Sequence, residues 1–156
     1  MIKIFIGLCP ENWYYYDQNC WYFSDDDEKV PFDAAQDLCK KGSEHSNLLS
    51  IHEERVNGFV ADVAKDDIWI GLQIKGDGDY KWLDNSAYDY NNWKDGGKNT
   101  TYFLLLFDNL SILNFSEPDD FENQQCTALN HQDATWSSEG CDQSKGFMCH
   151  FTSSKS

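Results

Sequence analysis

Six cysteines in a chain of 156 residues constrain the fold more than any other feature of this sequence. None of them forms a Cys-x-x-Cys pair, so their spacing does not favour a zinc site. In a small, acidic chain that is rich in aromatic residues, such cysteines indicate disulfide crosslinks and an oxidising compartment. Three of them, Cys126, Cys141 and Cys149, follow the segment Glu117-Pro118-Asp119 near the end of the chain. The combination predicts a crosslinked frame around a carboxylate-rich loop.

Length and charge narrow the class of fold and of ligand. A chain of this length is sufficient for one domain with its own core. The formal net charge of −15 argues against binding to nucleic acids or to anionic membranes, because both need a basic face. Acidity suits cation binding, although solubility alone also explains it. The sequence has no apolar run near the ~20 residues that a membrane-spanning helix needs.

Residues 1–8 form a short apolar opening. They resemble the end of a secretion signal, but the segment is too short to be a complete one, and an edge strand is the alternative. Because disulfide-forming cysteines require export, we interpret this chain as truncated or started at the wrong position.

The spacing of apolar residues predicts an α+β fold. They recur at helical spacing in two segments: Phe32, Ala35, Leu38 and Cys39, then Val56, Phe59, Val60 and Val63. Short strand patterns lie at residues 13–23, 48–51, 69–72 and 80–83, with Gly76-Asp77-Gly78 as a hairpin turn, and later around Cys126, Trp136 and Phe147. Two early helices followed by an irregular antiparallel sheet are therefore expected.

The order of these landmarks resembles the long form of the C-type lectin-like domain over residues 9–151, which leaves residues 152–156 as a tail. Trp69-Ile70-Gly71-Leu72 stands where that family has its core-strand signature, and Asn92-Trp93 resembles the entry to its long loop. Glu117-Pro118-Asp119 stands at the position of its sugar- and calcium-binding tripeptide. The resemblance implies two helices, small antiparallel sheets with a mixed-direction core, and a long irregular loop.

The resemblance also implies three disulfides, whose pairing the sequence alone leaves open. In the family pattern Cys9 pairs with Cys20, Cys39 with Cys149, and Cys126 with Cys141. The first of these pairs would close an N-terminal hairpin.

A calcium site is implied as well, and the expected ligand set is Glu117, Asp119, Gln124, Ser137 and Ser138. Glu117 and Asp119 match family ligands and are the expected metal-binding residues. Gln124 replaces a glutamate, and the two serines replace an amide and a carboxylate. Since Ca²⁺ prefers roughly six to eight oxygens with substantial negative charge, this set predicts weak or absent calcium binding.

The tripeptide does not indicate a sugar class. Glu-Pro-Asn accompanies mannose-type sugars in the family and Gln-Pro-Asp accompanies galactose-type sugars. The two carboxylates of Glu117-Pro118-Asp119 only accept hydrogen bonds when ionised, and a solvated loop turn is the alternative interpretation. Asp79 and Asp120 lie near positions that bind an auxiliary calcium in some relatives, but a solvated hairpin and loop explain them better.

An apolar run from Gly97 to Ser116 does not fit the family, which has only a few residues between Trp93 and Glu117. Removing the run restores the ordinary spacing, and its Phe, Leu, Ile, Asn and Tyr content is what A/T-rich sequence encodes in frame. We hypothesise a retained intron in the gene model and expect this segment to be the least well packed. The rival interpretation is a real loop that is covered by glycans at three sequons, Asn99, Asn109 and Asn114.

Catalysis is the least supported class of function. His45, His52, His131 and His150 are scattered without metal-ligand spacing, and no Gly-x-Ser-x-Gly motif or phosphate-binding glycine loop occurs. The family pairing leaves no free thiol. Trp69, Trp82, Trp93 and Trp136 are expected in the core rather than at a ligand platform.

The sequence is therefore interpreted as a secreted, extracellular glycoprotein domain without enzyme activity. Its expected ligand is a carbohydrate at a degenerate Ca²⁺ site. The alternative is a calcium-independent domain that binds an extracellular protein, and neither nucleic-acid binding nor membrane insertion is expected.

Overall fold

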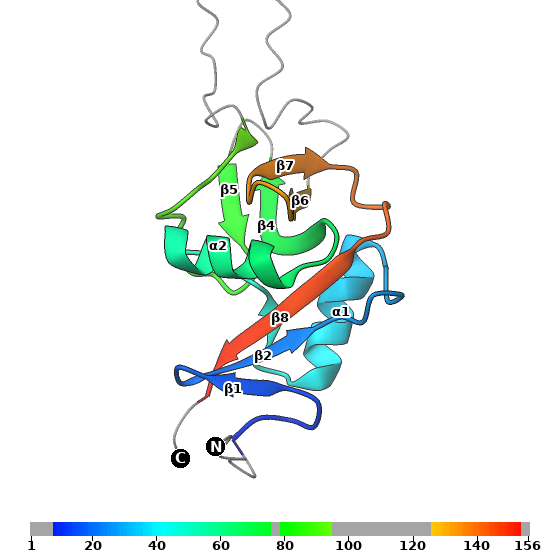
Figure 1. Cartoon of the computed structure of the whole chain (residues 1–156), viewed down its shortest axis with the longest axis vertical. Helices are drawn as coiled ribbons and strands as arrows, with labels where there is room; N and C mark the ends of the chain where they lie inside the picture. The colour runs from blue at the N-terminus through cyan, green and yellow to red at the C-terminus, as the bar shows by residue number, and fades with distance from the viewer. Residues whose placement is uncertain (1–7, 76–78, 95–125, 154–156) are drawn as a thin grey trace, which may run out of the picture.

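The computed structural model describes residues 8–75, 79–94 and 126–153, and these contain two helices and eight strands (Figure 1). The helices are α1 (Phe32–Gly42) and α2 (Glu54–Val63). The strands are β1 (Tyr14–Tyr16), β2 (Asn19–Phe23), β3 (Asn47–Leu48), β4 (Ile68–Lys75), β5 (Asp79–Trp82), β6 (Cys126–Leu129), β7 (Trp136–Glu139) and β8 (Gly146–Thr152). The expected α+β class is confirmed. The expectation for residues 97–116 lies outside the described part of the chain.

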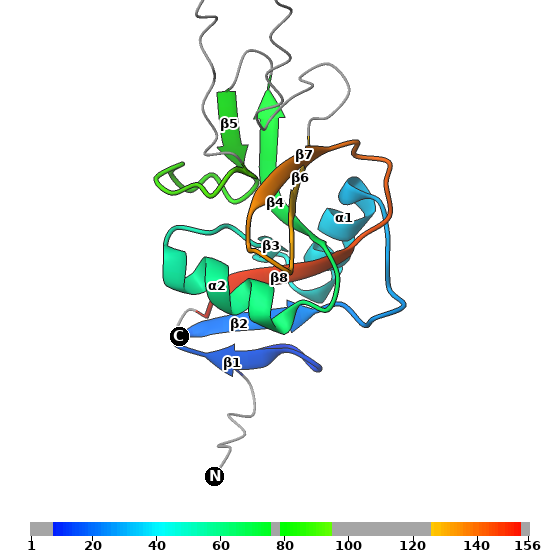
Figure 2. The ribbon, with the colours of Figure 1, turned by 45° about the horizontal axis from the view of Figure 1, so that its top comes forward.

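The strands form one mixed sheet in the order β1-β2-β8-β4-β6-β7, with β3 paired to β8 and β5 to β4. The β4–β8 contact is parallel and the other pairs are antiparallel. Strand β8 runs between the two helices (Figures 1 and 2). Phe147 and Cys149 pack in the cluster of α1, whereas Met148 packs in the cluster of α2. The alternation of side chains along β8 thus gives each helix its own face.

Helix α1 follows the expected pattern. Phe32, Ala35 and Cys39 are buried, Asp33 lies in the first turn, and Lys40 and Lys41 lie in the last, as the helix dipole favours. The backbone N–H of Phe32 donates to the carbonyl of Cys141, 3.0 Å away, which fixes the start of the helix against a crosslinked loop.

Helix α2 buries a different face from the one that its apolar spacing suggests. Val60 is buried as expected, but its buried neighbours are Ala61 and Asn57. Phe59 and Val63 remain exposed. The apolar stripe of this helix is therefore wider than the face that the core covers.

The core-strand signature has a steric basis in β4. Trp69, Ile70 and Leu72 are buried, and Trp69 meets Phe32 edge-on with ring centroids 5.5 Å apart. Gly71 lies against β3, where an added Cβ would come within 2.5 Å of the Leu48 carbonyl oxygen. Only glycine permits this approach without moving backbone. The four tryptophans expected in the core are all buried.

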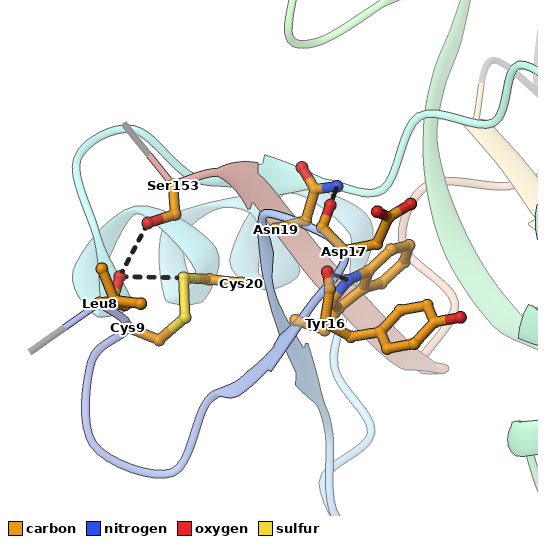
Figure 3. The surroundings of a disulfide bond; sticks show 8 residues. Leu8, Cys9, Tyr16, Asp17, Asn19, Cys20 and Ser153 are labelled. Atoms are coloured by element: carbon orange, nitrogen blue, oxygen red, sulfur yellow. Dashed lines mark hydrogen bonds between the residues drawn. A yellow bond between two sulfur atoms is a disulfide. The ribbon is translucent and has the colours of Figure 1, made fainter. Parts of the chain in front are cut away.

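All three expected disulfides are present: Cys9–Cys20, Cys39–Cys149 and Cys126–Cys141. Cys39–Cys149 ties α1 to β8 across 110 residues of sequence. Figure 3 shows that Cys9–Cys20 lies beside Ser153, whose hydroxyl donates to the Leu8 carbonyl over 3.3 Å. The approach of Leu8 oxygen to Cys20 Sγ is a sulfur–oxygen contact, because a disulfide sulfur carries no proton.

A buried amide joins α2 to β7. Asn57 is 2% exposed, and its Oδ1 accepts a hydrogen bond of 2.7 Å from Trp136 Nε1. Its Nδ2 donates to the Ala134 carbonyl over 2.9 Å, and Asn92 Nδ2 donates to the same oxygen over 2.8 Å. The helix, the β6–β7 turn and the segment before Trp93 therefore meet at one polar point inside the core.

Two glycine substitutions test the packing of β4. We expect Gly71→Ala to lower the free energy of unfolding by about 1–3 kcal/mol, because the new methyl group meets the backbone of β3. Gly58→Ala is the matched control: it lies within α2 with nothing within 4 Å of an added Cβ, and should raise stability by about 0.5–1 kcal/mol. Denaturant unfolding measures both, and equal effects would contradict the steric account.

The two hydrogen bonds of the Asn57 side chain predict that Asn57→Asp lowers the free energy of unfolding by an amount that depends on pH. A carboxylate still accepts from Trp136 but faces the Ala134 carbonyl without a proton to donate, which should cost about 1–3 kcal/mol. A protonated acid restores the donor, so the loss should shrink from about pH 7.5 to about pH 5. Asn91→Asp, at an exposed position, is the control. A pH-independent loss in Asn57→Asp would show that the missing donor is not its cause.

Candidate functional site

The expected site residues are divided between the described part of the chain and the remainder. Glu117, Asp119, Asp120 and Gln124 lie outside the described residues, as do the sequons at Asn99, Asn109 and Asn114. Ser137 and Ser138 lie on β7, and Asp79 begins β5 opposite Lys75 of β4. The site can therefore be built from β7 and from the two points at which residues 95–125 join the fold.

Strand β7 separates the two serines. Alternation places Ser137 and Glu139 on the more exposed face and Trp136 and Ser138 on the buried one. Ser138 is only 3% exposed. Ser137 Oγ donates to Glu139 Oε1 over 3.0 Å, so the structure brings together a hydroxyl and a carboxylate. Sequence reasoning missed Glu139, although the period of two along a strand places it on the same side as Ser137.

The described donors alone do not form a calcium site. Ser137 and Glu139 supply two side chains, whereas Ca²⁺ takes roughly six to eight oxygens. Within residues 8–75, 79–94 and 126–153, no three His, Cys, Asp or Glu side chains gather to hold a metal ion. A cation at this face would need Glu117, Asp119 and Gln124 for its remaining side-chain ligands.

Both points of attachment of residues 95–125 lie against β7. On one side, Trp93 forms a bridge with Trp136, and the Trp136 N–H donates to the Asn92 carbonyl over 2.9 Å. On the other side, Cys126 pairs with Glu139 and is crosslinked to Cys141. Residues 94 and 126 are thus held close to the same strand.

Six aromatic residues support this strand, and we call them the aromatic plate: Tyr80, Trp82, Tyr88, Tyr90, Trp93 and Trp136. Trp136 meets the rings of Trp82, Tyr90 and Trp93 edge-on, at centroid distances of 5.7, 5.8 and 5.8 Å. Trp93 Nε1 donates to the Tyr88 hydroxyl over 2.8 Å. Burial raises the pKa of Tyr88 to about 12, so its hydroxyl keeps its proton. The plate gives the face a rigid base.

A second polar group that sequence reasoning missed has the order of a hydrolase triad. His52 Nε2 lies 3.2 Å from Ser50 Oγ, and His52 Nδ1 lies 2.6 Å from Asp89 Oδ1. Ser50 and His52 are two residues apart, but Asp89 is 37 residues from His52 and the three carry no motif, so only the fold reveals the group.

The directions of the hydrogen bonds among Ser50, His52 and Asp89 do not suit nucleophilic catalysis. Ser50 is 6% exposed, and its hydroxyl donates to Asp84 Oδ2 over 2.5 Å. Its oxygen is then left to accept from His52, which is the reverse of what a general base requires. Burial alone would raise the pKa of Asp84, but hydrogen bonds from Ser50 and Ser86 outweigh it and lower that pKa. The group ties residues 50–52 to the segment that leads to Trp93.

The comparisons with known proteins agree with this architecture. The family model of the lectin C-type domain matches residues 28–151. The human secretory phospholipase A2 receptor is 29% identical over 91% of this chain, which spans 9% of that receptor's length. Lectin BRA-3 of Megabalanus rosa is 27% identical over 90% of this chain and 77% of its own length.

Solved structures show the same fold. The carbohydrate-recognition domain of the mouse scavenger receptor C-type lectin matches with a TM-score of 0.69 and 26% identity, over 95% of this chain and 99% of that domain. A calcium-independent type II antifreeze protein matches with a TM-score of 0.71 over 94% of this chain and 95% of its own, but at 22% identity it supports the fold alone. In the described part of the chain, no helix has the length and apolar character needed to cross a membrane. With the family model covering most of its length and the three disulfides in place, the chain belongs to the C-type lectin domain family.

Proposed function

We propose that this domain recognises carbohydrate outside the cell, through the face formed by β7 and residues 95–125. The observation that carries the proposal is that both attachment points of this segment lie against β7: Trp93, of the aromatic plate, forms a bridge with Trp136, and Cys126 pairs with Glu139. The described residues that flank this segment, Trp93 and Cys126, are therefore both fixed against one strand. Ser137 and Glu139 already lie on the exposed face of that strand.

Family members support carbohydrate as the ligand class. The matched mouse domain is a carbohydrate-recognition domain by name, and BRA-3 is named a lectin. The ligand of the phospholipase A2 receptor carries less weight here, because the chain spans only 9% of that receptor. Disulfide bonds persist in oxidising compartments, which supports an extracellular location.

In this proposal, Glu117 and Asp119 are the main ligands of a weakly bound calcium ion. Gln124 adds a neutral oxygen ligand, and Ser137 and Glu139 add side-chain oxygens from β7. The hydroxyl of Ser138 lies on the buried face, so we assign it a lesser role. A bound Ca²⁺ would offer open positions for sugar hydroxyls, which are hard oxygen ligands of the kind that this ion prefers.

A second candidate function is calcium-independent binding of an extracellular protein. Strand β7 offers only Ser137 and Glu139 as calcium ligands on its more exposed face, which favours this second candidate. The likeness to a calcium-independent antifreeze protein is in keeping with it. We propose no enzymatic role, because the Ser50 proton is directed to Asp84 rather than to His52.

Calcium linkage separates the two candidates. If the ion binds the folded state, unfolding should cost about 2.7 kcal/mol more when free calcium is about a hundredfold above its dissociation constant. We expect millimolar calcium to raise the melting temperature, chelator to reverse the rise, and a glycan array to give calcium-dependent signals. The chain is melted both with and without residues 97–116, so that the result does not depend on that segment.

Matched variants locate the effect. Glu117→Gln and Asp119→Asn should each remove most of the calcium-induced rise, whereas Asp142→Asn, at an exposed position in the β7–β8 connection, should leave it unchanged. Magnesium should not substitute, since it demands a smaller, octahedral site. No rise together with a blank array would contradict the carbohydrate proposal and leave the protein-binding candidate.

A further inference from the structure

A second surface of the domain exposes large apolar side chains. Among the described residues, the exposed large hydrophobic residues are Tyr14 (65%), Tyr16 (61%), Phe59 (42%) and Val63 (39%). The two tyrosines are two residues apart on β1, and Phe59 and Val63 are four apart on α2, so each pair lies on one face of its element. Exposed aromatic groups gathered in this way are typical of interaction sites.

Two hollows follow one another along these elements. One has a volume of about 650 Å³ and is lined by residues that include Tyr14, Phe23, Val63 and Met148. The other has a volume of about 390 Å³ and is lined by residues that include Tyr16, Trp21, Phe59 and His150. The register places Trp21 opposite His150 and Phe23 opposite Met148, so β2 and β8 line both hollows.

We call this surface the aromatic groove, defined by Tyr14, Tyr16, Trp21, Phe23, Phe59 and Val63. Its walls are held in place by contacts between rings: Tyr14 to Phe23 at 5.7 Å, and Trp21 to Phe59 at 6.0 Å. Trp21 Nε1 also donates to the Tyr16 carbonyl over 3.4 Å, within the hairpin that Figure 3 shows. The groove is thus already formed in the free domain.

The charges beside the groove indicate the occupant. The larger hollow is lined by four aspartates and two lysines: Asp25, Asp26, Asp27, Asp66, Lys29 and Lys65. Asp17, Glu53 and Arg55 line the smaller one, where Arg55 already pairs with Glu53 over 2.9 Å. Burial lowers the pKa of His150, so this ring adds no positive charge at neutral pH. Beside both hollows, carboxylate side chains therefore outnumber lysine and arginine side chains.

We propose that the aromatic groove docks a basic, amphipathic segment of a protein partner. Its apolar side chains enter the two hollows, and its lysine or arginine side chains meet the acidic rims. Complementary charge favours encounter and selects the partner. A second copy of this chain is a poorer occupant, because each copy carries a net charge of −15. Four of the six groove residues belong to β1 and β2, and these strands lie at the end of the fold opposite β7 (Figures 1 and 2). This inference therefore does not depend on the carbohydrate proposal.

The test uses a helical peptide of leucine and lysine in amphipathic order, and a second peptide with glutamate in place of lysine. Binding is followed by fluorescence anisotropy and by backbone amide NMR shifts of the labelled domain. We expect the lysine peptide to shift amides of β1, β2 and α2, and the glutamate peptide to bind at least about tenfold more weakly.

Phe59→Asp makes the test decisive. The substitution removes an aromatic wall but adds a negative charge, so purely electrostatic attraction to the lysine peptide would strengthen. We expect binding to weaken at least about tenfold instead. Val63→Asp is a second variant in case Phe59→Asp disturbs folding, and Gln143→Asp adds the same charge at an exposed position of the β7–β8 connection. Gln143→Asp should bind the lysine peptide as tightly as the unmodified chain.

Three results would overturn the proposal. The first is unchanged or tighter binding in both groove variants, and the second is a set of shifts confined to residues around β7. The third is a dimer in sedimentation velocity that Phe59→Asp or Val63→Asp dissociates, which would assign the groove to a second copy of the chain.

Discussion

The hydrogen bond from Trp136 to the side chain of Asn57 holds the ligand-facing end of this domain to its helical body. A buried amide is costly unless both its donor and its acceptor are satisfied, and here Trp136 and the Ala134 carbonyl satisfy them. Ala134 also accepts from Asn92, so one buried point positions α2, the β6–β7 turn and the start of the long segment. The aromatic plate and the exposed face of β7 take their places from it.

The sequence predicted the frame of the fold well because its signals are local or covalent. The α1 stripe, the buried strand at Trp69-Ile70-Gly71-Leu72 and the family's cysteine order all describe constraints that act on single elements or bonds. Helix α2 was predicted, but not which of its faces is buried. Asn57 is a polar residue, and only its hydrogen bond to Trp136, 79 residues away, makes it part of the core. Conversely, Phe59 and Val63 fit the apolar pattern and are exposed.

The candidate site was less predictable, since function depends on which groups meet. Ser137 and Ser138 are adjacent in sequence yet lie on opposite faces of β7, and Glu139 joins Ser137 through strand alternation. Asp89 comes from a different segment than Ser50 and His52, so the sequence does not bring the three together. The Ser50 hydroxyl donates its proton to Asp84, and this direction decides what the group can do. Glu117, Asp119 and Gln124 stay predictions.

The contact between Leu8 and Ser153 has a mechanical consequence. These residues are separated by nearly the whole described chain, yet a hydrogen bond of 3.3 Å joins them, on the side of the fold away from β7. If such a domain were strung between neighbours in a longer polypeptide, tension would enter and leave at almost the same place. The Cys9–Cys20 crosslink and the β2–β8 pair would carry the load, because the crosslink bypasses residues 10–19 and with them β1. The aromatic plate lies outside that path and would keep its geometry under such tension.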